Sequence, residues 1–166
     1  MQTDQTPVAA PAVRPFDADA VRTRAEALKH LDGALMPILH DLQETYGYID
    51  EAALPIIADV LNLTRAEVHG VVSFYHDFRR MPAGRHVVRL CRAEACQATG
   101  GEALAARAEQ RLGIATGGTT ADGRVTLEAV YCLGLCAVAP SAMVDGRLVG
   151  RLDEAALDGL LADLAD

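Results

Sequence analysis

Apolar residues recur at helical spacing through most of the first half of the chain. The pattern predicts helices over about 17–30, 35–47 and 50–62, each bounded by a polar or glycine residue. A fourth helix begins at residues 64–67, Thr-Arg-Ala-Glu. This tetrapeptide fits a capping box, in which the Thr oxygen accepts from the amide three residues on and the Glu side chain reaches back. We therefore expect a helical N-terminal subdomain over residues 17–82.

The pattern changes to short β-type segments after Met81-Pro-Ala-Gly84. The expected elements are, in order, a strand at 86–91, a helix at 100–112, a strand at 125–131, a hairpin turned at Asp145-Gly146, and a last helix capped by Asp153. This order predicts an α+β fold class, with an α/β layer around a small sheet, in a second domain over 83–166.

Composition narrows the class of protein. The chain has 166 residues and is 51% apolar, so it is long enough for one domain with an appendage and can bury a core. Its net charge of −8 argues against a nucleic-acid binder, which needs Lys and Arg to neutralise phosphates. We see no apolar run near the ~18 residues of a membrane span and no signal peptide. Residues 1–16, with three prolines and no apolar period, are expected to be a flexible tail, and the protein to be cytoplasmic.

All four cysteines lie in two close pairs in the second half of the chain. Four residues separate Cys91 from Cys96, and three separate Cys132 from Cys136. Each pair starts where a predicted strand ends, so the four thiolates converge if those strands are neighbours. A stable disulfide framework is not expected in a reducing cytoplasm. Iron–sulfur clusters of the [2Fe–2S] type need four thiolates, and two for each iron is the natural division.

Other uses of four cysteines can be weighed against the same spacing. Structural zinc is commonly bound by pairs two to four residues apart, so a zinc-stabilised, non-redox interaction module stays open. The C-x2-C-x2-C run of four-iron ferredoxins and the C-x-x-C of thioredoxin-type oxidoreductases are both missing. A Rieske centre needs histidine ligands, and residues 87–166 contain no His. Unrelated buried cysteines would not be expected as two pairs at strand ends.

Three segments together resemble a known family. They are Glu67-Val-His-Gly-Val-Val-Ser-Phe-Tyr75, Cys91-Arg-Ala-Glu-Ala-Cys96, and Cys132-Leu-Gly-Leu-Cys136 with Pro140. They resemble the thioredoxin-like [2Fe–2S] family, which includes the E subunit of NADH:quinone oxidoreductase and the gamma subunit of soluble NAD-dependent formate dehydrogenase. The resemblance covers about residues 30–160, and residues 74–79 and 91–97 look more similar to the formate dehydrogenase subunit.

The resemblance implies a fold, a cofactor and partners. It implies a helical N-terminal part followed by a thioredoxin-like domain, with Cys91, Cys96, Cys132 and Cys136 as ligands of one [2Fe–2S] cluster. The chain would be a non-catalytic electron-transfer subunit of an NAD-dependent oxidoreductase. Its expected partners are an FMN- and NAD(H)-binding subunit and a cluster-rich, molybdenum- or tungsten-containing, formate-oxidising subunit. The alternative parents are NADH:quinone oxidoreductase and NAD-reducing hydrogenase.

Two further groups of residues carry open interpretations. Three aromatic residues within 74–78 are expected either to pack in a core or to anchor a partner. Five arginines within 79–92 form either a solvated connector or a basic edge that docks a partner or raises the potential of an anionic cluster. His69 and His76 do not stand at cysteine-ligand spacing, and we expect structural or surface roles for both.

Overall fold

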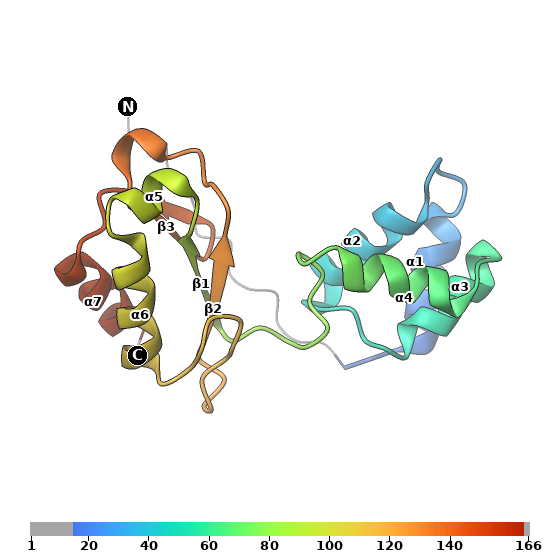
Figure 1. The fold of residues 1–166 in the computed structure, drawn as a ribbon. Coiled ribbons are helices and arrows are strands. Elements are labelled where there is room, and N and C mark those ends of the chain that lie inside the picture. Colours follow the sequence, from blue (N-terminus) through green and yellow to red (C-terminus); the bar gives the residue numbers. More distant parts are fainter. Residues whose placement is uncertain (1–14, 165–166) are drawn as a thin grey trace. The chain divides into compact units, whose positions relative to one another are not determined.

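The computed structural model describes residues 15–164, so residues 1–14 of the predicted tail lie outside the described part. The described residues form two compact units, of which one ends at Pro82 and the other begins at Ala83 (Figure 1). No helix among the described residues is long and apolar enough to cross a membrane.

The N-terminal unit is built from four helices whose ends follow the local sequence. Their bounds are α1 Ala18–Leu28, α2 Leu35–Tyr46, α3 Ala53–Leu61 and α4 Arg65–Phe74. The Asp17 side chain caps α1, and Thr64 and Glu67 form the predicted capping box on α4. Gly47 and Asn62 end α2 and α3 in the left-handed conformation, with φ of 83° and 53°. The predicted helices are confirmed.

The core of this unit is aliphatic, and the aromatic segment lies at its margin. The most fully buried side chains include Val21, Ile38, Leu39, Leu42, Ile57 and Val68. Phe78 is buried and its ring centroid lies 5.1 Å from that of His40, as packing predicts. Phe74, however, is 73% exposed and Tyr75 is 45% exposed. Both rings lie at the end of α4, because the helix ends at Phe74 and the backbone becomes extended at Tyr75.

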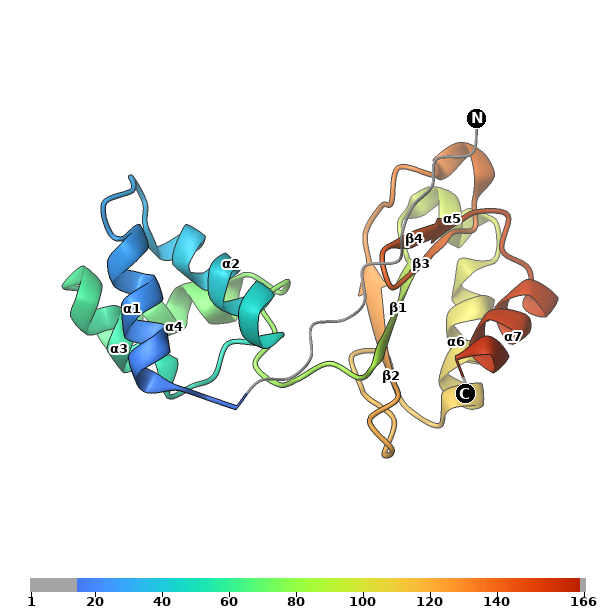
Figure 2. The same ribbon diagram turned by 180° about the vertical axis from the view of Figure 1, so that it is seen from behind.

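The C-terminal unit is a four-stranded sheet with helices. Its elements are β1 His86–Cys91, α5 Glu94–Ala98, α6 Gly101–Leu112, β2 Val125–Val130, the short 3-10 helix Cys136–Val138, β3 Ala142–Val144, β4 Arg147–Val149 and α7 Glu154–Asp163. The strand order is β2-β1-β3-β4, with β1 parallel to β2 and the other pairs antiparallel. Helices α6 and α7 lie on one face of the sheet (Figures 1 and 2). The predicted α+β class is confirmed.

Two local features beside the cysteines differ from the predicted elements. Cys96, which the predicted elements leave between a strand and a helix, lies inside α5, because Glu94–Ala98 forms a five-residue helix too short to show an apolar period. Strand β2 ends at Val130, so Tyr131 lies outside the strand predicted over 125–131, and it is 75% exposed. The cause is the next residue, Cys132, whose φ of 94° is incompatible with extended backbone.

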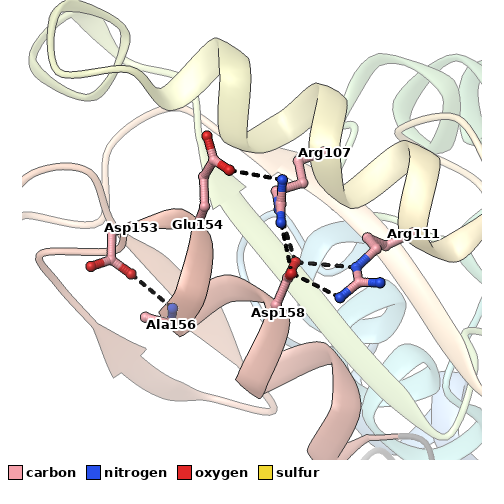
Figure 3. Close-up of polar contacts among 6 residues, drawn as sticks. All are labelled: Arg107, Arg111, Asp153, Glu154, Ala156 and Asp158. Carbon is pink, nitrogen blue, oxygen red and sulfur yellow. Dashed lines mark hydrogen bonds and ion pairs between the residues drawn. The ribbon is translucent and has the colours of Figure 1, made fainter.

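A charged cluster joins α6 to α7 (Figure 3). Arg107 and Arg111 each donate two hydrogen bonds to the carboxylate of Asp158, at 2.8–3.2 Å. Arg107 also pairs with Glu154, at 2.8 Å between Nη1 and Oε2. The hydrogen bonds from Arg107 and then Arg111 hold the pKa of Asp158 well below its usual range. The cluster therefore favours the packed pair of helices most when Asp158 is ionised.

The start of α6 approaches the cysteine region closely. A Cβ atom built on Gly101 would lie 2.7 Å from the Cys96 carbonyl oxygen, which real side chains do not tolerate. Gly159, in the middle of α7, has open space around the same position and ordinary helical backbone. A side chain is therefore sterically excluded at Gly101 but not at Gly159, although both residues lie within helices.

We expect Asp158→Asn to lower the Tm at neutral pH, because an amide cannot form the paired charge interactions with both arginines. Since the folded-state pKa of Asp158 is lowered, its contribution is present above the unfolded pKa of about 3.9 and is lost as the pH falls below that value. Thermal unfolding is followed by circular dichroism at several pH values. The Tm difference between the variant and the parent should become smaller as the pH falls below about 4. Asp163→Asn, at the exposed end of the same helix, is the control. A Tm loss that is independent of pH would contradict the assignment.

We expect Gly101→Ala and Gly159→Ala to change stability in opposite directions. The first forces the backbone of Cys96 to move and should destabilise by about 1–3 kcal/mol. The second adds helix propensity without a clash and should stabilise by about 1 kcal/mol. Urea unfolding of the two variants beside the parent measures both. Equal effects would show that the close approach at Gly101 does not constrain the fold.

Candidate metal centre

The parallel pairing of β1 and β2 brings the predicted cysteines to one edge of the sheet. Cys91 is the last residue of β1 and stands opposite Val130, the last residue of β2. The Arg92 amide continues the ladder by donating to the Val130 carbonyl at 2.8 Å. Cys132 follows two residues after Val130. The neighbouring strands that the sequence argument required are therefore present, and both cysteine pairs start at the same edge.

The first pair is buried. Cys91 is 4% exposed and Cys96 is 2% exposed. Cys91 is held by the sheet, since its amide donates to the Ser141 carbonyl at 3.0 Å. Cys96 is held by α5, and its sulfur lies 3.5 Å from the Ser141 hydroxyl oxygen. One residue thus contacts both members of the buried pair.

The second pair is exposed and lies in a loop with left-handed backbone. Cys132 has a φ of 94° and Gly134 a φ of 76°, so both residues have left-handed backbone. The sulfurs of Cys132 and Cys136 lie 3.7 Å apart, and the Gly134 amide donates to the Cys132 sulfur at 3.4 Å. A left-handed conformation at a residue other than glycine is strained. The loop therefore accepts strain in bringing its two sulfurs together.

Groups from each cysteine pair act on the pKa of a thiol in the other pair. Burial acts to raise the pKa of the Cys91 thiol, but hydrogen bonds from the Ala93 amide, from Cys96 and from the amides of Cys132 and Leu133 outweigh it and lower that pKa. The pKa of Cys136 is raised, first by its hydrogen bond and charge interaction with Cys132, then by burial and by the charges of Cys96 and Cys91. Four sulfurs that repel one another as thiolates are a site suited to a cation.

The spacing of the exposed pair fits a tetrahedral metal. Two sulfurs bound at about 2.3 Å to one tetrahedral ion lie about 3.8 Å apart, and the Cys132 and Cys136 sulfurs are separated by 3.7 Å. Within residues 15–164, no three His, Cys, Asp or Glu side chains are grouped around a single ion. What the structure shows is one close sulfur pair, Cys132 and Cys136, with backbone amides directed at the sulfurs of Cys91 and Cys132.

The other candidate residues lie apart from the sulfurs or are already paired. Arg89 pairs with Glu128 at 2.8 Å, and Arg92 pairs with Glu102, so these two arginines do not form an unneutralised basic edge. His69 lines a pocket of the helical unit. The sequence argument missed Ser141, because neither its spacing nor its residue type indicated a contact with cysteine.

Comparisons with known proteins agree with this geometry. The sequence profile of the thioredoxin-like [2Fe–2S] ferredoxin family matches residues 21–165. The chain is 40% identical over 112 residues to the E subunit of the NADH-quinone oxidoreductase of Pseudomonas aeruginosa, with 68% of each protein covered. It is 32% identical over 138 residues to the NADP-reducing hydrogenase subunit HndA of Solidesulfovibrio fructosivorans, with 83% of this chain and 81% of that protein covered.

A solved structure shows the same fold. An NAD+-reducing [NiFe]-hydrogenase in the H2-reduced state matches 78% of this chain with a TM-score of 0.66 and 29% identity. The match spans only 22% of that longer chain. The predicted thioredoxin-like fold and the predicted [2Fe–2S] cofactor are both confirmed, since the profile that matches is defined by them. The chain therefore belongs to the thioredoxin-like [2Fe–2S] ferredoxin family.

Proposed function

We propose that Cys91, Cys96, Cys132 and Cys136 hold the [2Fe–2S] cluster, with one pair on each iron. The observation that carries this proposal is the meeting of a buried and an exposed sulfur pair at the end of two parallel strands. The 3.7 Å separation of the exposed sulfurs and the amide groups directed at Cys91 and Cys132 support it. Family membership disfavours the zinc-stabilised module, which shares the sulfur spacing.

The cluster supplies one-electron exchange, which lets a flavin in another protein carry out hydride chemistry. The residues of this chain would set the reduction potential of the cluster and leave one side of it accessible to a partner. The amides of Ala93 and Gly134 place positive ends of N–H dipoles against the Cys91 and Cys132 sulfurs. Cys91 and Cys96 lie away from water, whereas Cys132 and Cys136 lie at the surface, where a partner can approach.

We further propose that the two compact units are separate domains, the helical one over residues 17–82 and the cluster-bearing one over 83–166. None of the four cysteines forms a disulfide with another, which suits a reducing compartment, and we place the protein in the cytoplasm.

The parent complex that we propose is a soluble NAD-dependent formate dehydrogenase, with this chain as its gamma subunit. The support is the resemblance of residues 74–79 and 91–97 to that subunit. The partners would then be an FMN- and NAD(H)-binding subunit and a molybdenum- or tungsten-containing formate-oxidising subunit. A role as the E subunit of an NADH:quinone oxidoreductase, or a role in an NAD-reducing hydrogenase, is the second candidate. It is favoured by the names of the 40% and 32% identical relatives.

We expect Cys91→Ser and Cys132→Ser each to reduce the iron content and change the visible spectrum of the anaerobically purified protein, because one thiolate ligand is lost from each iron in turn. Ala137→Ser is the matched control, since Ala137 is exposed in the same part of the chain and carries no ligand atom. It should leave iron content and colour unchanged. Cysteine variants that keep the parent's spectrum and iron would show that the ligand assignment is wrong.

We expect the chain, tagged and purified anaerobically from the cells that produce it, to bring down a complex that reduces NAD+ with formate and contains molybdenum or tungsten. The same preparation is assayed with H2 and with NADH plus a quinone as alternative reactions. Activity in one of these assays and none with formate would favour the second candidate over the formate dehydrogenase assignment.

A further inference from the structure

Ser141 occupies a special place beside the buried sulfur pair. It follows Pro140, directly precedes β3, and is 3% exposed, one of two polar side chains in the described core. Its carbonyl accepts from the Cys91 amide at 3.0 Å, and its hydroxyl oxygen lies 3.5 Å from the Cys96 sulfur. Because β3 pairs with β1 through Ala142 and Leu90, the sheet fixes the position of Ser141 relative to Cys91.

The direction of this hydrogen bond follows from the chemistry of a bound ligand. In the thiol form, either the Cys96 sulfur or the Ser141 oxygen can donate. A metal-bound cysteine is a thiolate without a proton, so the hydroxyl must then be the donor. Within the described residues, the Cys96 sulfur is the side-chain partner of this hydroxyl. A buried hydroxyl with one sulfur partner therefore donates to that sulfur whenever the site is loaded.

We propose that Ser141 is a positioning residue that raises the reduction potential of the cluster by donating a hydrogen bond to the Cys96 sulfur. The inference rests on the proposed ligand role of Cys96. Reduction adds one negative charge to the cluster, and a donor directed at a ligand sulfur stabilises the more negative state more strongly. Water does not replace this bond, because both Cys96 and Ser141 are buried.

Neighbouring hydroxyls do not share this role. Thr99, one turn after Cys96, donates to the carbonyl oxygens of Ala95 and Cys96 and not to a sulfur. Thr126, the other buried polar side chain, bonds to the Gly84 amide and the Thr119 hydroxyl. It stands opposite Val87, near the start of β1, whereas Cys91 is at the end of that strand. Thr126 thus provides a buried hydroxyl in the same unit, remote from the sulfurs.

The test is the midpoint potential of the full-length protein, measured by anaerobic dye-mediated titration in the parent and in Ser141→Ala. The substitution removes the hydroxyl and keeps the carbonyl that binds the Cys91 amide. We expect the ratio of reduced to oxidised cluster at a fixed solution potential to fall about tenfold, which is a shift of about 59 mV to more negative potential. A change of less than about twofold would overturn the proposal.

Three further variants separate this effect from damage to the fold. Ser141→Thr keeps the hydroxyl donor and should retain the parent's midpoint potential. Ser141→Gly adds no atom that could clash and should show the same potential as Ser141→Ala. If Ser141→Ala does not fold, the potential of Ser141→Gly is the test. Thr126→Val should leave the potential unchanged. A shift in Ser141→Thr equal to that in Ser141→Ala, or an equal shift in Thr126→Val, would also overturn the inference. Iron and sulfide content is measured in each sample. A parent protein without iron and sulfide would refute the proposed function. A cluster-containing Ser141→Ala protein with the parent's potential would refute only the role of Ser141.

Discussion

The parallel pairing of β1 with β2 is the constraint on which the candidate metal centre depends. The crossover through α5 and α6 returns the chain to the start of β1, so that β2 runs beside β1 in the same direction. The two parallel strands therefore end at the same edge of the sheet. Cys91 at the end of β1 and Cys132 just after β2 are neighbours for this reason. Antiparallel β3 then brings Ser141 to the same edge from the other side of β1. The site is therefore assembled by the sheet from segments distant in sequence.

The two halves of the site differ in a way that suits electron transfer. Cys91 and Cys96 are buried, with backbone amides directed at the Cys91 sulfur and the Ser141 hydroxyl at the Cys96 sulfur. The sulfurs of Cys132 and Cys136 lie in a strained surface loop. Under the proposed function, the enclosed half controls the potential and the open half allows a partner to come close. The chain needs no substrate pocket at this site for such a role.

Local signals in the sequence predicted much of the fold. Asp17, Thr64, Gly47 and Asn62 act as helix ends because each satisfies backbone groups through contacts within a few residues. The cysteine spacing, together with strand ends, also predicted that two pairs would meet. These features depend on short stretches of chain, which a single sequence displays directly.

What sequence reasoning missed depends on tertiary contacts or on very short segments. Helix α5 has five residues, too few for a periodic pattern, so Cys96 was placed outside a helix. Tyr131 seemed to continue an alternating strand, but the left-handed backbone of Cys132 turns the chain and leaves its ring exposed. Ser141 matters because Cys96, 45 residues away in the sequence, folds against it. No spacing rule connects such residues.

The most direct test of the account is the metal and acid-labile sulfide content of the full-length protein, purified anaerobically, together with its visible spectrum before and after dithionite. The account predicts two irons and two sulfides for each polypeptide, with colour that bleaches on reduction. One zinc ion, no sulfide and no colour would contradict it, because Zn²⁺ has a filled d shell and cannot carry an electron.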